Sequence, residues 1–199
     1  MRCDDCGDDF FLAFSCKGRG VCPSCNTRRM AEAAAHLSDH VFPRLPVRQW
    51  VLSVPKRLRY YLQRDEGAPN GALRIYLRVV QQSLLAHCPG VARADPASLH
   101  LGAVACIHRF GSSLNTHVHF YVCVVDGVFE AQSVNTDTSA QANPQSGPEL
   151  APQSVIFHAA TGLDEAAFRQ VQANARKRIL RAFVARGHLD AHDAKDLAA

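Results

Sequence analysis

Apolar residues along this chain recur with two different spacings. In some segments they return every third or fourth position, which is typical of an amphipathic helix. In others they run together or alternate with polar residues, which is typical of a strand. The helical spacing predicts four helices, at residues 26–42, 56–64, 72–87 and 163–186. The other pattern predicts strands at residues 48–54, 98–110, 116–127, 127–132 and 154–158.

The segments between these elements complete the expected architecture. The two longest strands are separated only by the turn-forming GSSLN, so we expect them to form an antiparallel hairpin. Residues 133–153 are polar and rich in Pro, Ser and Asn, which is typical of a flexible linker or surface loop. The polar tail from Leu189 is expected to fray. The sum predicts an α+β fold, with helices packed on an antiparallel sheet and a small cysteine-rich module in front.

Four cysteines near the start form two pairs with metal-ligand spacing. Cys3 and Cys6 make the first C-x-x-C pair, and Cys22 and Cys25 make the second after fifteen intervening residues. Two such pairs offer four thiolates to one tetrahedral zinc, and a closed site of this kind is structural. The alternatives are four buried free cysteines, or a set in which Cys16 replaces one of the four.

The other scattered ligand-type residues give weaker signals. His36 and His40 are four positions apart on a predicted helix and could bind a metal. No third ligand stands near them, however, so a partly exposed polar face is the favoured interpretation. The remaining cysteines are expected to be small core residues; they are Cys88, Cys106 and Cys123.

Positive charge is concentrated in the first part of the chain. The formal net charge is +4, but the stretch from Lys17 to Arg78 holds twelve Lys or Arg against four Asp or Glu. Arginine, whose planar guanidinium suits phosphate, makes up 18 of the 22 basic residues. This charge pattern points to a polyanionic partner such as nucleic acid, and a solvated basic face is an equal alternative on charge alone. The cations that could give the cysteine module a DNA-contacting surface are Lys17, Arg19, Arg28 and Arg29.

Targeting signals are not evident. No window has the apolar length of a membrane span, and the acidic start MRCDDCGDDF lacks the layout of a signal peptide. We therefore expect a soluble, cytoplasmic protein whose cysteines are thiols or metal ligands rather than disulfides.

The segment NTHVHFYVCVVDG places two histidines in a strand. Because alternate residues of a strand share a face, His117 and His119 point the same way as Tyr121, while Val118 and Phe120 point the other way. Two neutral imidazoles on one face suit a divalent cation that keeps open positions for a substrate oxygen. A hydrogen-bonded pair of histidines at a sheet edge is the alternative.

A third histidine bears on both interpretations. His108, on the partner strand, could supply a third ligand; if Phe110 pairs with Thr116, however, it faces Val118 on the wrong side. Alternating histidines also occur in the histidine-triad nucleotide hydrolases. Their third histidine would stand where Tyr121 stands, which weakens that alternative.

Four segments occur in a characteristic order: CDDCG, FSCKGRGVCPSCNTRRMAE, PVRQWVLSVPKRLRYYL and HRFGSSLNTHVHFYVCVVDGVF. Together they resemble the transposases of rolling-circle insertion sequences, members of the HUH endonuclease superfamily. The resemblance covers most of the chain and is weakest across the predicted linker and the tail. It implies a zinc-binding module before a catalytic domain whose histidine–hydrophobic–histidine motif holds Mg²⁺ or Mn²⁺. That cation polarises a phosphate of single-stranded DNA, which a tyrosine attacks to form a phosphotyrosine.

Carried onto this sequence, the resemblance implies specific ligands. His117 and His119 would hold the catalytic cation, and the structural zinc would be held by Cys3, Cys6, Cys22 and Cys25. It also implies four regions, which are a zinc-binding module leading into a helix (1–42), a partial HUH-type catalytic core (43–132), a linker (133–153), and a strand with a helical segment (154–199).

The sequence departs from this family at the nucleophile. The family's tyrosine lies well downstream of the histidine motif, whereas no tyrosine follows Tyr121 here. Tyr121 itself shares the histidines' strand and is too constrained, and Tyr60 and Tyr61 belong to a predicted packing helix. We therefore expect a truncated transposase that lacks its front and its tyrosine segment. The alternative function is a non-catalytic, zinc-dependent DNA-binding remnant that competes with a full-length transposase for DNA ends.

Overall fold

A computed structural model describes residues 5–7, 9, 23–110, 115–132 and 154–198. The chain divides into two compact units, Met1–Leu45 and Pro46–Ala199. The predicted linker at 133–153 lies outside the described residues, as do four predicted site residues: Cys3, Cys22, Lys17 and Arg19. Cys16 lies outside them too.

The described part of the first unit is mainly one helix. The helix α1 spans Pro23–His36 and continues as a π-helical turn at Leu37–Val41. The predicted helix at 26–42 is confirmed, with a start three residues earlier; proline is well tolerated in a first helical turn. The described side chains of α1 are exposed, including Met30 at 65%.

The second unit contains two small antiparallel sheets. In the first, β4 (Thr116–Val125) is the central strand, flanked by β1 (Val47–Ser53) and β3 (Ala103–Phe110). The second has the order β2-β5-β6, with bounds Leu99–His100, Gly127–Gln132 and Ser154–Ala159. One residue, Asp126, separates β4 from β5, so one stretch of backbone passes from the first sheet into the second.

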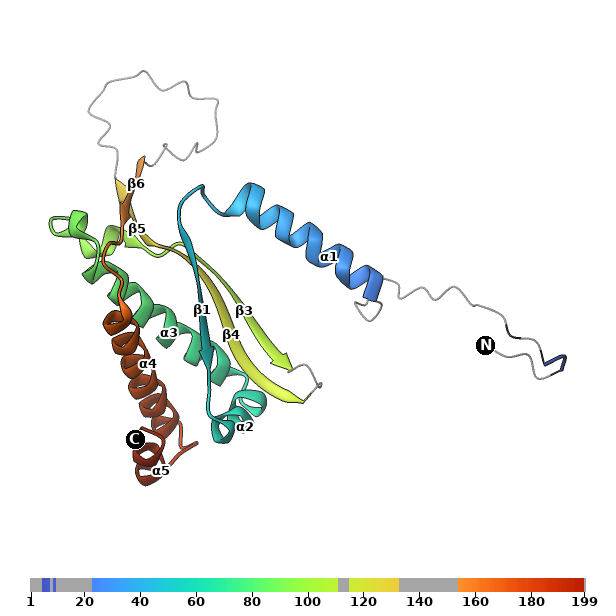
Figure 1. The fold of residues 1–199 in the computed structure, drawn as a ribbon. Helices are drawn as coiled ribbons and strands as arrows, with labels where there is room; N and C mark the ends of the chain where they lie inside the picture. The colour runs from blue at the N-terminus through green and yellow to red at the C-terminus, as the bar shows by residue number, and fades with distance from the viewer. Residues whose placement is uncertain (1–4, 8, 10–22, 111–114, 133–153, 199) are drawn as a thin grey trace, which may run out of the picture. The chain divides into compact units, whose positions relative to one another are not determined.

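Four α-helices belong to this unit: α2 (Lys56–Arg64), α3 (Gly67–Ala86), α4 (Glu165–Ala185) and α5 (Ala191–Asp196). Two short 3₁₀ turns, Pro89–Val91 and Pro96–Ser98, connect α3 to β2. The long helices α3 and α4 pack against one another (Figure 1). No helix in the described part of the chain is both long and apolar enough to span a membrane.

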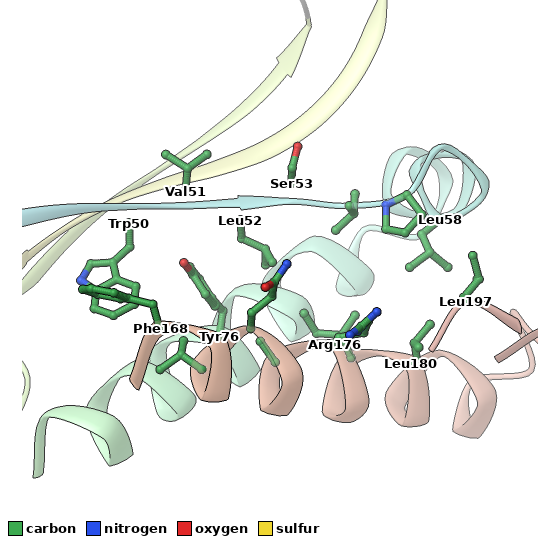
Figure 2. Close-up of a pocket in the computed structure, with 16 residues that line it drawn as sticks. Trp50, Val51, Leu52, Ser53, Leu58, Tyr76, Phe168, Arg176, Leu180 and Leu197 are labelled. Atoms are coloured by element: carbon green, nitrogen blue, oxygen red, sulfur yellow. The ribbon is translucent and has the colours of Figure 1, made fainter. Parts of the chain in front are cut away.

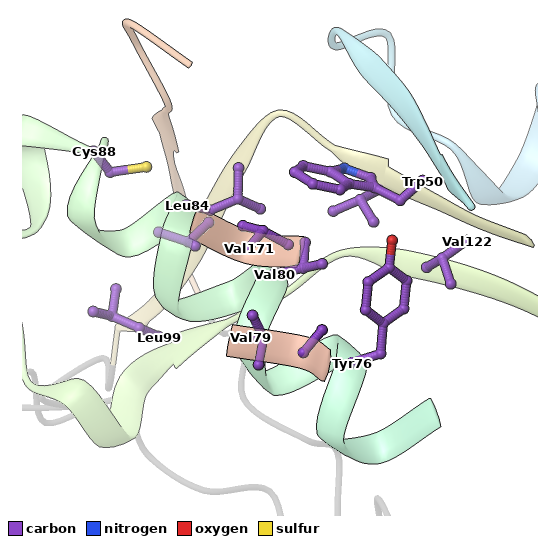
Figure 3. Close-up of a cluster of buried hydrophobic side chains, with 12 residues drawn as sticks. Trp50, Tyr76, Val79, Val80, Leu84, Cys88, Leu99, Val122 and Val171 are labelled. Carbon is purple, nitrogen blue, oxygen red and sulfur yellow. The ribbon is translucent and has the colours of Figure 1, made fainter. Parts of the chain in front are cut away.

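The core lies between the first sheet and the helices. Trp50 of β1 and Val122 of β4 meet Tyr76 of α3 and Val171 of α4 in one buried cluster (Figure 3). A second cluster joins β4 to α2 and α4. The predicted α+β class, with antiparallel sheets and packed helices, is confirmed.

One predicted strand and one predicted helix differ from the structure in their bounds. The single strand expected at 98–110 is two strands in different sheets, broken at Gly102. A Cβ at Gly102 would lie only 2.6 Å from the ring of Phe129, so the Phe129 side chain occupies the space that a side chain at this position would need. Helix α3 begins five residues before the predicted 72–87 segment. The Asp65 carboxylate accepts hydrogen bonds from the backbone N–H groups of Gly67 (2.8 Å) and Ala68 (3.2 Å), which caps the first turn.

The tail expected to fray is also helical. Asp190 precedes α5, and its carboxylate accepts a hydrogen bond of 2.6 Å from the backbone N–H of Asp193. This N-cap satisfies a helix-terminal donor that a frayed tail would leave to water.

Candidate metal centre

The central strand β4 has one face covered by helices and one face open. Val118, Phe120, Val122 and Val124 are fully buried, whereas the residues between them are half-buried. The same alternation continues on β1. Figure 2 shows Trp50 and Leu52 pointing toward α4, and Val51 and Ser53 pointing the other way. The histidine motif therefore lies on the open face.

The strand register brings a third histidine to this face. His119 pairs with Ser53 of β1 on one side and with His108 of β3 on the other. Phe110 does pair with Thr116 at the end of the hairpin, but a β-bulge places one extra residue in β4 between the two pairs. The expectation that His108 would then face Val118 is wrong because of this bulge.

The side chains on the open face form a contiguous group. The ring centroid of His119 lies 5.0 Å from that of His117 and 5.2 Å from that of His108. The Tyr121 ring contacts two of these histidines, at 4.7 Å from His108 and 5.1 Å from His119. We refer to His108, His117 and His119 as the histidine cluster.

Hydrogen bonding prepares His119 to act as a ligand. Its Nδ1 lies 2.8 Å from the carbonyl oxygen of His117. Because a carbonyl oxygen can only accept, Nδ1 must carry the proton. In the neutral ring Nε2 is then unprotonated, which is the state in which an imidazole binds a metal.

His117 carries a buried nitrogen with nothing to bind. Its Nε2 is inaccessible to solvent and has no hydrogen-bond partner in the described part of the chain. A buried polar atom without a partner costs free energy and is rare unless an ion or a water satisfies it. A donor set of neutral imidazoles fits a divalent first-row transition metal, and Mn²⁺ is the weakest binder of that series; Mg²⁺, which prefers oxygen ligands, fits these rings less well.

Charge and burial both disfavour the protonated form of His117. Burial lowers its pKa, and the positive charge of Arg59 together with His119 lowers it further. A metal ion competes with protons for imidazole nitrogen, so the neutral ring is the form that a metal would bind. The positive charge of Arg59 opposes a bound cation as it opposes a proton, and it suits an anion such as phosphate. Arg59 lies on α2, where its Nε donates to the carbonyl oxygen of Val54 at 3.2 Å. Sequence reasoning missed this arginine, since only the packing of α2 on β4 places it there.

The ring nitrogens of the histidine cluster do not converge on one point. In the described residues, the one group of three whose ligand atoms all lie within 4.8 Å of each other is His192, Asp193 and Asp196 on α5. That group is largely exposed, and Asp193 already pairs with Arg57 at 2.8 Å. One ion could therefore contact all three rings of the histidine cluster only after side-chain rotations.

The tyrosines differ sharply in environment. Tyr76 is in the core, where burial raises its pKa to about 12. Tyr61 stacks on the His188 ring at 4.9 Å and meets Phe183 edge-on. Tyr60, in contrast, is 53% exposed. Both tyrosines belong to α2, so the predicted packing helix is confirmed, although the Tyr60 side chain is largely exposed.

The cysteines outside the paired motif are not all core residues. Cys88 is buried, and its Sγ donates to the carbonyl oxygen of His158 at 3.4 Å. Cys106 is exposed and Cys123 is half-buried, so the prediction that these two are core residues is wrong. Both belong to the open face, where Cys106 is directly opposite Tyr121.

The remaining predicted site residues lie in the first unit. Cys6 is exposed, and Cys25 belongs to the first turn of α1. Arg28 and Arg29 are exposed on α1, and the Arg28 guanidinium pairs with Glu32 at 2.7 Å. The rings of His36 and His40, 5.4 Å apart, are also exposed.

A cavity of about 490 Å³ lies on the covered side of the sheet, between β1 and α4 (Figure 2). It is lined mainly by apolar side chains, among them Trp50, Leu52 and Phe168. None of the histidine cluster lines it. The histidine cluster is therefore on the open face and not in the cavity.

Two family models match the chain. One, described as "Transposase zinc-binding domain", matches residues 1–54. The other, described as "Putative transposase", matches residues 102–198 and includes the whole histidine cluster. No curated protein and no solved structure matches the chain.

Proposed function

Since this chain belongs to the transposases, with the zinc-binding domain of that family at its N-terminal end, we propose that it acts in rolling-circle DNA transposition. Its substrate would be the single-stranded ends of a mobile element, which are nicked and rejoined in the cytoplasm. The observation that carries this proposal is the grouping of three histidines on the open face of β4.

The histidine cluster is the proposed site of a divalent cation, Mg²⁺ or Mn²⁺. His117 and His119 are the principal ligands, as the HUH motif implies, and His108 is the third. When bound, the cation would offset charge on the scissile phosphate. The chain's own contribution is to hold His119 in one orientation through its Nδ1 and to lower the pKa of His117, which disfavours its protonated form. Arg59 adds a positive charge beside the phosphate position.

The first unit is the proposed second DNA contact. Cys3, Cys6, Cys22 and Cys25 would bind one structural zinc, in agreement with the zinc-binding family of residues 1–54. The cations proposed to contact DNA around this zinc are Lys17, Arg19, Arg28 and Arg29. The pairing of Arg28 with Glu32 is no obstacle, because an exposed ion pair contributes little and exchanges readily for phosphate.

The nucleophile is the part that this chain does not supply in the family's usual position. No tyrosine follows Tyr121 in the sequence, and Tyr76 is buried in the core. This observation favours a second candidate function, that of a DNA-binding competitor that occupies element ends without forming a phosphotyrosine.

Metal titration tests the proposed cation site. We expect Mn²⁺ binding, measured by isothermal titration calorimetry, to be abolished by the double substitution His117→Ala with His119→Ala. The matched control is His192→Ala, which removes an exposed histidine from the convergent group on α5. Loss of Mn²⁺ binding in His192→Ala and not in the double variant would move the metal site to α5.

A covalent-adduct assay separates the two candidate functions. The purified chain is incubated with labelled single-stranded element-end DNA and Mn²⁺, then denatured and resolved by gel electrophoresis. DNA binding without an adduct, lost in the double histidine variant, supports the competitor. An adduct contradicts the view that this chain lacks a working nucleophile.

Metal analysis tests the zinc site independently. We expect about one zinc per chain in freshly purified protein, reduced by Cys6→Ser, with Cys106→Ser as the matched control in the second unit. Absence of zinc from fresh protein would remove the four-cysteine assignment.

A further inference from the structure

Helix α2 is fixed against the histidine-bearing strand by its apolar side. Leu58 and Leu62 are buried in the same cluster as Val118 and Phe120 of β4. A helix turns by about 100° per residue, so the side chains of α2 that do not pack must follow one another around the opposite side. Starting with Arg59, which lies beside His117, the order around this side is Arg59, Gln63, Lys56, Tyr60, Arg64 and Arg57.

This outer side of α2 is basic and uncompensated. Lys56, Arg59 and Arg64 make no ion pair with any carboxylate in the part of the chain that the structure describes, whereas Arg57 pairs with Asp193. Unpaired cations on one helix side suit a phosphate backbone, whose bound counterions they displace.

Tyr60 stands in the middle of these cations, and its ring is held in place. The Arg64 guanidinium lies over the ring, with Cζ 4.5 Å from the centroid. Tyr61 meets the ring edge-on at 5.4 Å and is itself held by His188. Despite these contacts Tyr60 is 53% exposed. Such an aromatic ring, oriented by its neighbours and still open to solvent, is the arrangement on which unpaired bases stack.

We propose that Tyr60 is a stacking platform for an unpaired DNA base, and that Arg59 and Lys56 guide the adjoining backbone from this platform to the histidine cluster. The inference rests on the proposed function, since it assumes a single-stranded DNA substrate at that cluster. To the proposed function it adds helix α2 as the element that binds the DNA strand, and Tyr60 as the residue that contacts a base. Stacking is tolerant of sequence, so the platform would position the strand without selecting a base.

The test compares two substitutions on two probes. The probes are a labelled oligothymidylate and a strand of the same length made only of abasic sites. Tyr60→Ala removes the ring, whereas Tyr60→Phe keeps the ring and removes the hydroxyl. We expect Tyr60→Ala to weaken oligothymidylate binding about tenfold and Tyr60→Phe to change it less than about twofold. Both variants should bind the abasic strand as tightly as the wild type, and both should melt with the wild type because Tyr60 is exposed.

Other results would overturn the platform. Unchanged oligothymidylate binding by Tyr60→Ala, or an equal loss on the abasic strand, would exclude stacking. An equal loss in Tyr60→Phe would assign the effect to the hydroxyl. Failure of the wild type to bind oligothymidylate would overturn both this inference and the proposed function, whereas wild-type binding with no effect of Tyr60→Ala would overturn the platform alone.

Arg59→Gln provides a second measurement. Because Arg59 is proposed to contact phosphate, its loss should lower the slope of log affinity against log salt by about one on both probes. Tyr60→Ala should leave that slope unchanged. A changed slope in Tyr60→Ala, or none in Arg59→Gln, would contradict the division of roles.

Discussion

The ten residues of β4 alternate between two faces of the sheet, and the two faces differ in chemistry and burial. On the covered face Val118, Phe120, Val122 and Val124 are apolar and fully buried. On the open face the alternate positions carry two histidines, a tyrosine and a cysteine, all half-buried. The covered face packs against the helices, and the open face presents polar groups that take no part in this packing.

The difference shows how a strand can carry a site at little cost to stability. Burying an aliphatic or aromatic side chain contributes about 1.5–3 kcal/mol, so the covered face accounts for much of the stability of this unit. The open face contributes less, and even includes an unsatisfied buried nitrogen on His117. Polar residues that could bind a metal can therefore occupy the open face with little loss of stability.

The largest effect should come from the covered face. Phe120→Ala leaves a cavity among Leu58, Val118 and Phe183 and should lower the free energy of unfolding by about 3–5 kcal/mol. Its neighbour Tyr121→Ala, on the open face, is the matched control and should cost clearly less. Urea denaturation of both variants measures the difference. Equal losses of unfolding free energy would contradict the view that the covered face provides most of the stability.

Stabilisation by bound Mn²⁺ should depend on the open face and not on the covered face. Excess Mn²⁺, at about 100 times its dissociation constant, should stabilise the wild type by about 2.7 kcal/mol. The His117→Ala and His119→Ala variant should lose this increment. Its metal-free stability should fall by less than that of Phe120→Ala, because both rings are half-buried outside the core and loss of His117 also removes an unsatisfied nitrogen. Thermal melts with and without Mn²⁺ measure both quantities. A metal increment that survives in this variant would place the ion elsewhere.

Removal of the third histidine should have a smaller effect. His108→Ala should weaken Mn²⁺ affinity about tenfold, or about 1.4 kcal/mol, since two ligands remain. The adjacent, exposed Arg109→Ala is the control and should leave Mn²⁺ affinity unchanged. Equal affinities of His108→Ala and wild type would leave the cation with two protein ligands.

The smallest effect concerns acid stability on the covered side. The Asp65 carboxylate bonds to His188 Nε2 at 2.7 Å and caps α3, and these hydrogen bonds lower its pKa. Its contribution is therefore complete above the ordinary aspartate pKa of about 4 and is lost as pH falls through the lowered value. Asp65→Asn should be less stable than wild type at neutral pH, and the two unfolding curves should converge on acidification. A constant gap across pH would contradict this assignment.

Alternation and helical spacing were sufficient to predict most elements and the facing of β4. Helix α2 occurs at the predicted residues, since Pro55 stops β1 and the apolar spacing of Leu58 and Leu62 is clear. The open and covered faces follow from period two alone. These features depend on local pattern, which the sequence displays directly.

Features that depend on contacts between distant segments could not be predicted in this way. The break at Gly102 arises from packing against Phe129, which belongs to another strand. The position of Arg59 beside His117 depends on how α2 packs on β4. The helix after Asp190 had a local cap that could have been recognised, since aspartate is a favoured N-cap.

Because of the bulge in β4, the spacing of two residues along the sequence does not fix which residues face one another across the hairpin. Because the bulge takes up one residue between the hairpin end and His119, His108 faces His119 while Phe110 still pairs with Thr116. A related hairpin one residue shorter and without the bulge could present the same three rings. The number of residues between His108 and His117 therefore does not by itself determine which histidines face one another. A search for equivalent sites should match which histidines face one another across the two strands, and should allow the count between them to change.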